Sequence, residues 1–107
     1  MLRRAPERTT QERRSALEEA NRVRFARAAT KRDLKSGELA IYELLMDPSE
    51  ELKGAKVEEM LLAMRGMGRI KVTRVMREAG VSRSKTLVGI THGQRDRLIR
   101  ALGCEEG

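Results

Sequence analysis

The segment from residue 64 to residue 71 combines residue types that suit anion binding. In order, its residues are Met64, Arg65, Gly66, Met67, Gly68, Arg69, Ile70 and Lys71. Glycine permits positive φ angles and places no side chain in the path of a ligand, and a helical pattern begins directly after Gly68. The unpaired N–H groups and the dipole of that helix start favour a phosphate, with Arg69 and Lys71 beside it. We therefore predict a phosphate-binding turn here, and we expect Met67 to be buried and to anchor it.

A second group of polar and basic residues follows one predicted helix later. The residues that we expect to make this second contact are Arg74, Ser82, Arg83, Ser84, Lys85, His92, Gly93 and Gln94. Thr91 and Gln94 form a capping-box pattern, which marks the start of a last helix within this group. Two phosphate-sized contacts would suit one strand of a duplex.

The turn can also be interpreted without any ligand, and the enzymatic interpretations lack the residues that they require. Gly66 could simply end the preceding helix without binding any ligand. A nucleotide-binding P-loop requires GxxxxGK followed by Ser or Thr, and a dinucleotide fingerprint requires a third glycine after a strand. The single histidine, His92, and the basic Lys71 have no recognisable partners for nucleophile activation, and Cys104 is the single cysteine. We therefore expect no enzyme, no catalytic residue, no metal, no cofactor and no small-molecule substrate.

The composition describes one small domain with excess positive charge. The chain has 107 residues, of which 36% are charged and 39% hydrophobic, and its net charge is +7. It contains no apolar run of 18 residues and no secretory-type start, so we expect a cytoplasmic protein without a membrane partner. Its aromatic residues are Phe25 and Tyr42, too few to stack the bases of single strands. These features favour the phosphate backbone of a duplex as the partner.

The charge is strongly divided along the chain. Residues 1–35 hold 11 basic and 5 acidic side chains. Residues 36–63 hold 2 basic and 7 acidic ones, and residues 64–107 hold 10 basic and 4 acidic ones. The net charges of the three segments are therefore +6, −5 and +6. We assign the acidic segment to the core and to solubility, with no binding role.

Periodicity and helix-ending residues predict a chain of helices without a convincing strand. The expected helices span about 9–36, 39–46, 56–64, 69–79 and 91–102, with a loop at 49–54 and an irregular segment at 81–90. Thr9 and Glu12 form a capping-box pattern at the start of the first helix, and Gly37 and Gly80 are the expected helix ends.

The first helix is basic and has a sparse apolar stripe. Its residues that would extend a phosphate footprint are Arg22, Lys31, Arg32 and Lys35. A charge run is more commonly a solvated helix face, and a helix that binds another protein is a further alternative.

The order of these features resembles the helix-two-turns-helix module, and actinobacterial integration host factors are the most similar family. The resemblance covers nearly the whole chain. It rests on the long basic first helix, the run KVEEMLL from Lys56, the Gly66 to Gly68 turn with Lys71, and Gln94 at the last helix start. Thr86 and Val88 depart from it, because relatives carry arginine there.

The resemblance implies an all-α fold, in which a long N-terminal helix packs on a compact helical body that contains this module. It divides the chain into a basic arm (1–37), a DNA-binding domain (38–103) and a disordered tail (104–107). It also implies a monomeric nucleoid-associated protein that binds double-stranded DNA with little sequence preference. Such a protein contacts phosphates through the turn, has its lid segment at residues 82–94, and bends or compacts DNA in support of recombination or transcription.

The alternative is a ribosomal-protein-like module that binds ribosomal RNA, since residues 66–101 also follow the pattern of the small-subunit ribosomal protein. The chain lacks that protein's Lys- and Arg-rich C-terminal tail.

Overall fold

The computed structural model describes residues 10–103, and these residues form the expected all-α fold. The elements are α1 (Thr10–Ser36), α2 (Ile41–Met46), the 3-10 helix η1 (Glu50–Leu52), α3 (Val57–Ala63), α4 (Arg69–Ala79) and α5 (His92–Leu102). A single antiparallel bridge, between Lys56 and Thr86, is the β pairing found in this part of the chain. The predictions that involve Thr9, Cys104 and the 104–107 tail lie outside the described residues.

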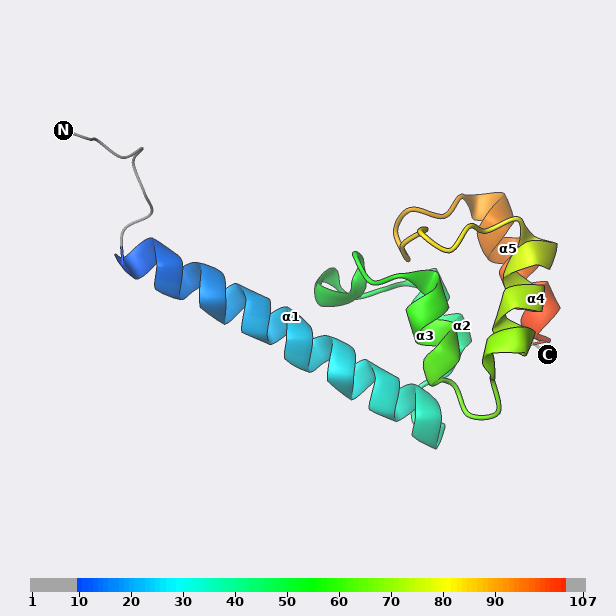
Figure 1. The fold of residues 1–107 in the computed structure, drawn as a ribbon, viewed down its shortest axis with the longest axis horizontal. Coiled ribbons are helices and arrows are strands. Elements are labelled where there is room, and N and C mark those ends of the chain that lie inside the picture. The colour runs from blue at the N-terminus through cyan, green and yellow to red at the C-terminus, as the bar shows by residue number, and fades with distance from the viewer. Residues whose placement is uncertain (1–9, 104–107) are drawn as a thin grey trace.

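Helix α1 is long because nothing between residues 10 and 36 interrupts it, and it ends where predicted. Gly37 has a φ of +91°, and its N–H donates to the carbonyl of Asp33 at 3.0 Å. Leu34 is the one residue of α1 that is buried, and the N-terminal half of the helix projects beyond the body (Figure 1). The rest of α1 packs on the body, against η1 and α3.

The core of the body is entirely hydrophobic among residues 10–103. Its largest fully buried side chains are Leu45, Leu52, Val57, Met60, Leu61, Val72, Leu87 and Leu98. The buried residues of α4 are Val72, Val75, Met76 and Ala79, the face that the periodicity predicted. Helices α4 and α5 pack against each other more extensively than any other pair of elements, so their packing positions both ends of α4.

The segment expected to be a loop at 49–54 contains η1, which corrects that prediction. Leu52 is 2% exposed, and its N–H donates to the carbonyl of Ser49 at 2.9 Å. Burial of this leucine winds the backbone into one tight turn, because a buried N–H needs an acceptor.

The irregular segment 81–90 is held by the core rather than by regular structure. Val81, Leu87 and Ile90 are buried. The N–H of Leu87 donates to the carbonyl of Ala55 at 2.9 Å, and the carbonyl of Lys85 accepts from Val57 at 3.0 Å.

The ends of α4 and α5 follow the sequence signals. Gly80 closes α4 with a φ of 71°, and Thr91 and Gln94 form the complete capping box that begins α5. The Gln94 side chain also donates to the Gly80 carbonyl at 2.8 Å, which joins the start of α5 to the end of α4. No helix within residues 10–103 is both long and apolar enough to cross a bilayer.

Candidate nucleic-acid interface

The predicted phosphate-binding turn joins α3 to α4 and lies on the surface. The N–H of Met67 donates to the carbonyl of Met64 at 3.2 Å, which closes a four-residue turn, and Gly66 holds its third position with a φ of +77°. Such a φ favours glycine, so the fold itself requires Gly66. Gly68 has an ordinary φ of −93°, and a Cβ added there would meet no atom within 4 Å. The fold does not require Gly68, and it leaves the backbone beside this residue open.

Helix α4 begins without a side-chain cap. Its N-cap is Gly68, and the first hydrogen bond of the helix runs from the Val72 N–H to the Gly68 carbonyl at 3.0 Å. The preceding N–H groups, those of residues 69–71, therefore have no acceptor within the helix. Lys71 folds back so that its Nζ lies 3.5 Å from the Gly66 carbonyl oxygen, which keeps its charge above the turn. These N–H groups and this charge form the arrangement that binds phosphate at helix starts.

Met67 anchors the turn less deeply than expected. The side chain is half-buried and packs against the edge of the core together with Met64, whereas we expected it to be buried. Both neighbours of Met67 are exposed glycines, so the turn protrudes and only one side of this methionine can face the core.

The C-terminal end of α1 lies beside the turn. Together they enclose a hollow of about 780 Å³, lined by Lys31, Arg32, Lys35, Ser36, Leu62, Ala63, Met64, Arg65 and Gly66. The structure thus brings three of the four predicted arm residues to the turn. Arg32, Lys35 and Arg65 have no ion pair within residues 10–103, whereas Lys31 pairs with Glu59 at 2.5 Å.

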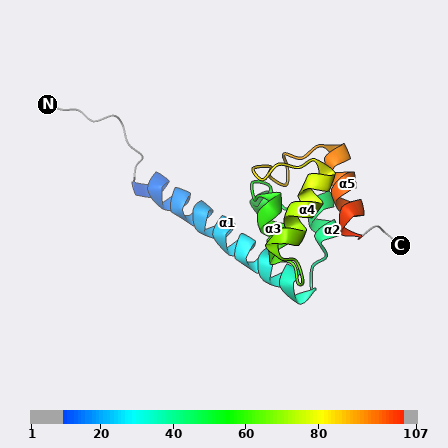
Figure 2. The ribbon, with the colours of Figure 1, turned by 45° about the vertical axis from the view of Figure 1, so that its right-hand side comes forward.

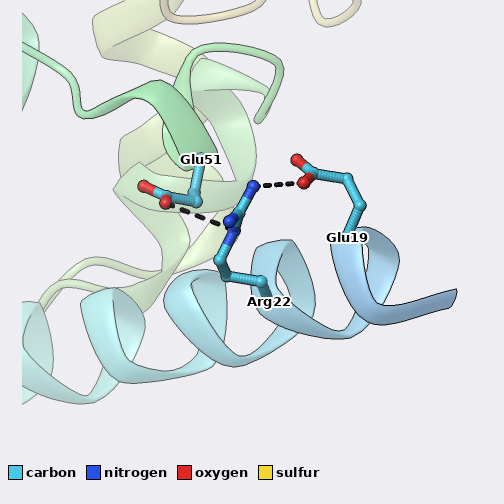
Figure 3. A network of polar contacts seen from close by, with 3 residues as sticks. All are labelled: Glu19, Arg22 and Glu51. Carbon is cyan, nitrogen blue, oxygen red and sulfur yellow. Dashed lines mark hydrogen bonds and ion pairs between the residues drawn. The ribbon is translucent and has the colours of Figure 1, made fainter. Parts of the chain in front are cut away.

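Arg22 is the arm residue that the structure keeps away from the turn. Its guanidinium contacts Glu19 of the same helix and lies 3.7 Å from the carboxylate of Glu51 in η1 (Figure 3). The hydrogen bond to Glu19, followed by the charge of Glu19, raises the pKa of Arg22 above its ordinary value. The contact with Glu51 joins α1 to the body, and both carboxylates balance the charge of Arg22.

The lid segment lies at the other end of α4 from the turn (Figures 1 and 2). A helix of 11 residues is about 16 Å long, which corresponds to about five base-pair steps of DNA. Here Arg83 pairs with Glu58 at 3.1 Å, and the Nζ of Lys85 lies 3.5 Å from the Gly89 carbonyl. Ser82 and Ser84 are exposed, with their hydroxyl oxygens 3.3 Å apart. The two predicted contacts are therefore well separated, and most lid groups have partners inside the protein.

The start of α5 is also engaged internally. The Gln94 amide oxygen accepts from the Thr91 N–H at 2.9 Å, while its nitrogen bonds Gly80, so both ends of this side chain are used. His92 is exposed, with its Nδ1 3.2 Å from a guanidinium nitrogen of Arg95. Since a guanidinium only donates, Nδ1 is the acceptor in this contact. Gly93 is exposed in the same first turn.

Comparison with known proteins matches this architecture. The sequence pattern of the S13-like H2TH domain family covers residues 34–102. Over the longer range, the chain is 34% identical to an integration host factor of Mycobacterium tuberculosis, across 92% of this chain and 95% of that protein. The chain belongs to the integration host factor family. The resemblance drawn from the sequence is therefore confirmed.

Two further relatives support membership of the same family. This integration host factor is 33% identical to the Mycolicibacterium smegmatis protein of that name, over 88% of this chain and 91% of the relative. The Streptomyces coelicolor protein of that name is 29% identical, over 92% of this chain and 94% of the relative. None of these three is named as an enzyme, in agreement with our expectation. A solved structure, that of sIHF bound to an 8-base-pair palindromic DNA, superimposes with a TM-score of 0.72 at 26% identity, covering 78% of this chain and 96% of that one.

The outer face of α4 is only partly covered by the predicted contacts, which include Arg69, Ile70 and Arg74 but not Thr73 and Arg77. Arg77 lies on this face with Arg74, and both are exposed. The face is hollowed by about 420 Å³, and its lining residues are Arg69, Ile70, Thr73, Arg74 and Arg77. The helical spacing from residue 70 to residues 73, 74 and 77 was the signal that could have identified it.

The acidic segment has a role that we did not expect. Its carboxylates pair with three of the cations predicted to bind phosphate: Glu51 with Arg22, Glu58 with Arg83, and Glu59 with Lys31. The ion pairs are partly exposed, so each adds little stability. Three predicted phosphate-binding cations are thereby balanced, whereas the predicted ones around the turn and on α4 have no ion pair within residues 10–103: Arg32, Lys35, Arg65, Arg69 and Arg74.

Proposed function

We propose that this integration host factor binds double-stranded DNA through backbone phosphates, with little sequence preference. The observation that carries the proposal is the uncapped start of α4, whose first N–H groups have no side-chain acceptor and lie beside an open glycine turn. Arg32, Lys35 and Arg65 surround this turn without competing carboxylates. The solved structure of sIHF on DNA supports the same partner.

The charges and the N–H groups have distinct tasks in this proposal. Backbone N–H groups fix the position of one phosphate by hydrogen bonds, and mobile cationic side chains neutralise its neighbours. Neither kind of contact distinguishes one base from another, so sequence preference would arise from the shape and deformability of the duplex.

We further propose that the protein acts as a monomer at the nucleoid and bends or compacts DNA. The turn and the lid segment would touch positions about five base pairs apart, which is suitable for following a curved duplex. Bending of this kind would support recombination or transcription. A bend is measured directly as the change in energy transfer between dyes at the two ends of a 30-base-pair duplex, and an unchanged transfer at saturation would contradict it.

Binding measured across a salt series tests the central proposal. If Arg32, Lys35, Arg65, Arg69 and Lys71 each neutralise a phosphate, log K falls with log salt with a slope of about −4.5. A slope near zero would exclude a phosphate-based interface.

Ribosomal RNA is the second candidate partner, because the matched family is described as S13-like. Competition between a 30-base-pair DNA duplex and a structured RNA of equal length at physiological salt separates the two. We expect the DNA to compete more strongly, and preference for the RNA would favour the second candidate.

A further inference from the structure

One large aliphatic side chain stands exposed at the DNA-facing end of α4. Ile70 is 85% exposed, the highest value among the large hydrophobic residues that the structure describes. Single exposed apolar residues are common on protein surfaces, so exposure alone says little. The position of Ile70 is what distinguishes it: the residue lies in the first turn of α4, two positions after Gly68.

The neighbours of Ile70 are polar or cationic and are not engaged elsewhere. Thr73, Arg74 and Arg77 follow at positions i+3, i+4 and i+7, so they share one stripe of the helix with Ile70. All three are exposed, and within residues 10–103 neither arginine has an ion pair. The stripe lies opposite the buried face of α4, so it makes no contribution to the core.

We infer that Ile70 enters the minor groove of duplex DNA bound at the turn, where it forms an apolar contact flanked by Arg69 and Arg74. The inference rests on the proposed function. Once the N–H groups of the first turn hold a phosphate, the next surfaces within reach of this turn are the sugar edges and the groove. The minor groove is about 6 Å wide, which admits a side chain but excludes a helix. Aliphatic wedges and arginines are the side chains that proteins place there.

This contact differs physically from every other contact at the interface. It releases no counterions, so its contribution does not depend on salt. It also depends on the floor of the groove, where guanine presents a 2-amino group that adenine lacks. Ile70 would therefore give a phosphate-binding protein a preference for minor grooves without that amino group.

The first test is the variant Ile70→Ala. Its side chain is exposed and alanine favours helices, so the variant folds, which circular dichroism and thermal unfolding verify. We expect a roughly tenfold loss of duplex affinity with the same salt slope as the unaltered protein. Met46→Ala, which shortens another exposed apolar side chain on α2, is the control and should change affinity less than twofold.

The second test examines the groove. Replacing G·C pairs by inosine·C pairs removes the 2-amino group and leaves the major-groove oxygen and N7 in place. We expect the unaltered protein to bind the inosine duplex at least threefold more tightly, and Ile70→Ala to lose this preference.

These measurements separate the inference from the proposed function. Unchanged affinity of Ile70→Ala, or an inosine preference that survives the substitution, overturns the role of Ile70 and leaves phosphate binding in place. A flat salt slope in the unaltered protein instead overturns the proposed function itself.

Discussion

The two helix starts of the module, those of α4 and α5, have similar surroundings and opposite chemistry. Both follow a loop with glycine and basic residues nearby. Helix α5 begins at Thr91 with a complete capping box, whereas α4 begins at Gly68 with no side-chain cap. The capping box of α5 satisfies the N–H groups of Thr91 and Gln94, whereas no side chain accepts from the first N–H groups of α4, which are left for a ligand.

The same difference extends to the charges at the two ends of α4. At the lid end, Arg83 is paired with Glu58, and Arg97 donates to the carbonyl of Ala79 at 3.1 Å. At the turn end, Arg32 and Arg65 border the hollow with no ion pair in the described residues. A basic sequence alone does not mark a binding surface; basic groups without internal partners do.

The largest expected effect comes from giving α4 the cap that it lacks. In Gly68→Asp the new carboxylate accepts from the first-turn N–H groups and repels phosphate, so we expect duplex affinity to fall at least a hundredfold. The free energy of unfolding should rise by a few tenths of a kcal/mol, because aspartate is a good N-cap and no atom blocks its Cβ. Fluorescence anisotropy and urea unfolding measure the two quantities. Retained affinity in the folded variant would refute the uncapped-helix account.

Charge reversal at the turn should have the next largest effect. Lys71→Glu removes one cation and adds an anion above the turn, and we expect a loss of ten- to thirtyfold that is equal for all duplex sequences. The salt slope should become less steep by about 0.9 or more. Arg83→Glu, at the lid end, is the comparison and should cost less than half as much in log affinity. A sequence-selective loss would show instead that Lys71 contacts bases.

Removing the cap of α5 should affect stability and leave DNA binding intact. Thr91→Ala deletes the hydroxyl that accepts from Gln94, and we expect the free energy of unfolding to fall by about 1 kcal/mol. Affinity measured well below the unfolding temperature should change less than twofold. A tenfold loss of affinity in the folded variant would mean that the Thr91 hydroxyl itself contacts DNA.

The smallest effect should follow from freeing a lid cation. Glu58→Gln removes the carboxylate that holds Arg83, and a partly exposed pair of this kind contributes at most about 1 kcal/mol. We expect affinity for duplex DNA at low salt to rise about twofold, and to rise less as salt increases. Added to an Arg83→Ala background, Glu58→Gln should give no increase over Arg83→Ala alone. An increase over Arg83→Ala would mean that the lost negative charge, rather than Arg83, is responsible.

Local signals in the sequence predicted much of the fold. The bounds of α4 follow from the Val72 to Ala79 periodicity and from Gly80, and those of α5 from Thr91, Gln94 and Gly103, each a short-range feature. The 3-10 turn at Leu52 was not predicted, because its cause is burial against α1 and the core rather than any local pattern.

The candidate site was likewise predicted in part, from neighbouring residues only. The glycine turn and its neighbouring cations were predicted from adjacent residues. The bond from Gln94 to Gly80 and the pairing of Arg83 with Glu58 were not predicted, because these contacts join residues that are 14 and 25 positions apart. The contact roles assigned to individual residues stay predictions until the variants are measured.

The sequence by itself determined where the helices begin and end, which face of α4 is buried, and that a glycine turn precedes an uncapped helix, because these properties depend on residues within a few positions of one another. Only the tertiary structure decided which charges remain free. Ion pairs require carboxylate and cation within about 4 Å in space, and the packing of α1 on α3 and η1 sets those distances. That packing balances Arg22 and Lys31 and brings Arg32 and Lys35 to the turn, across some 30 residues of chain.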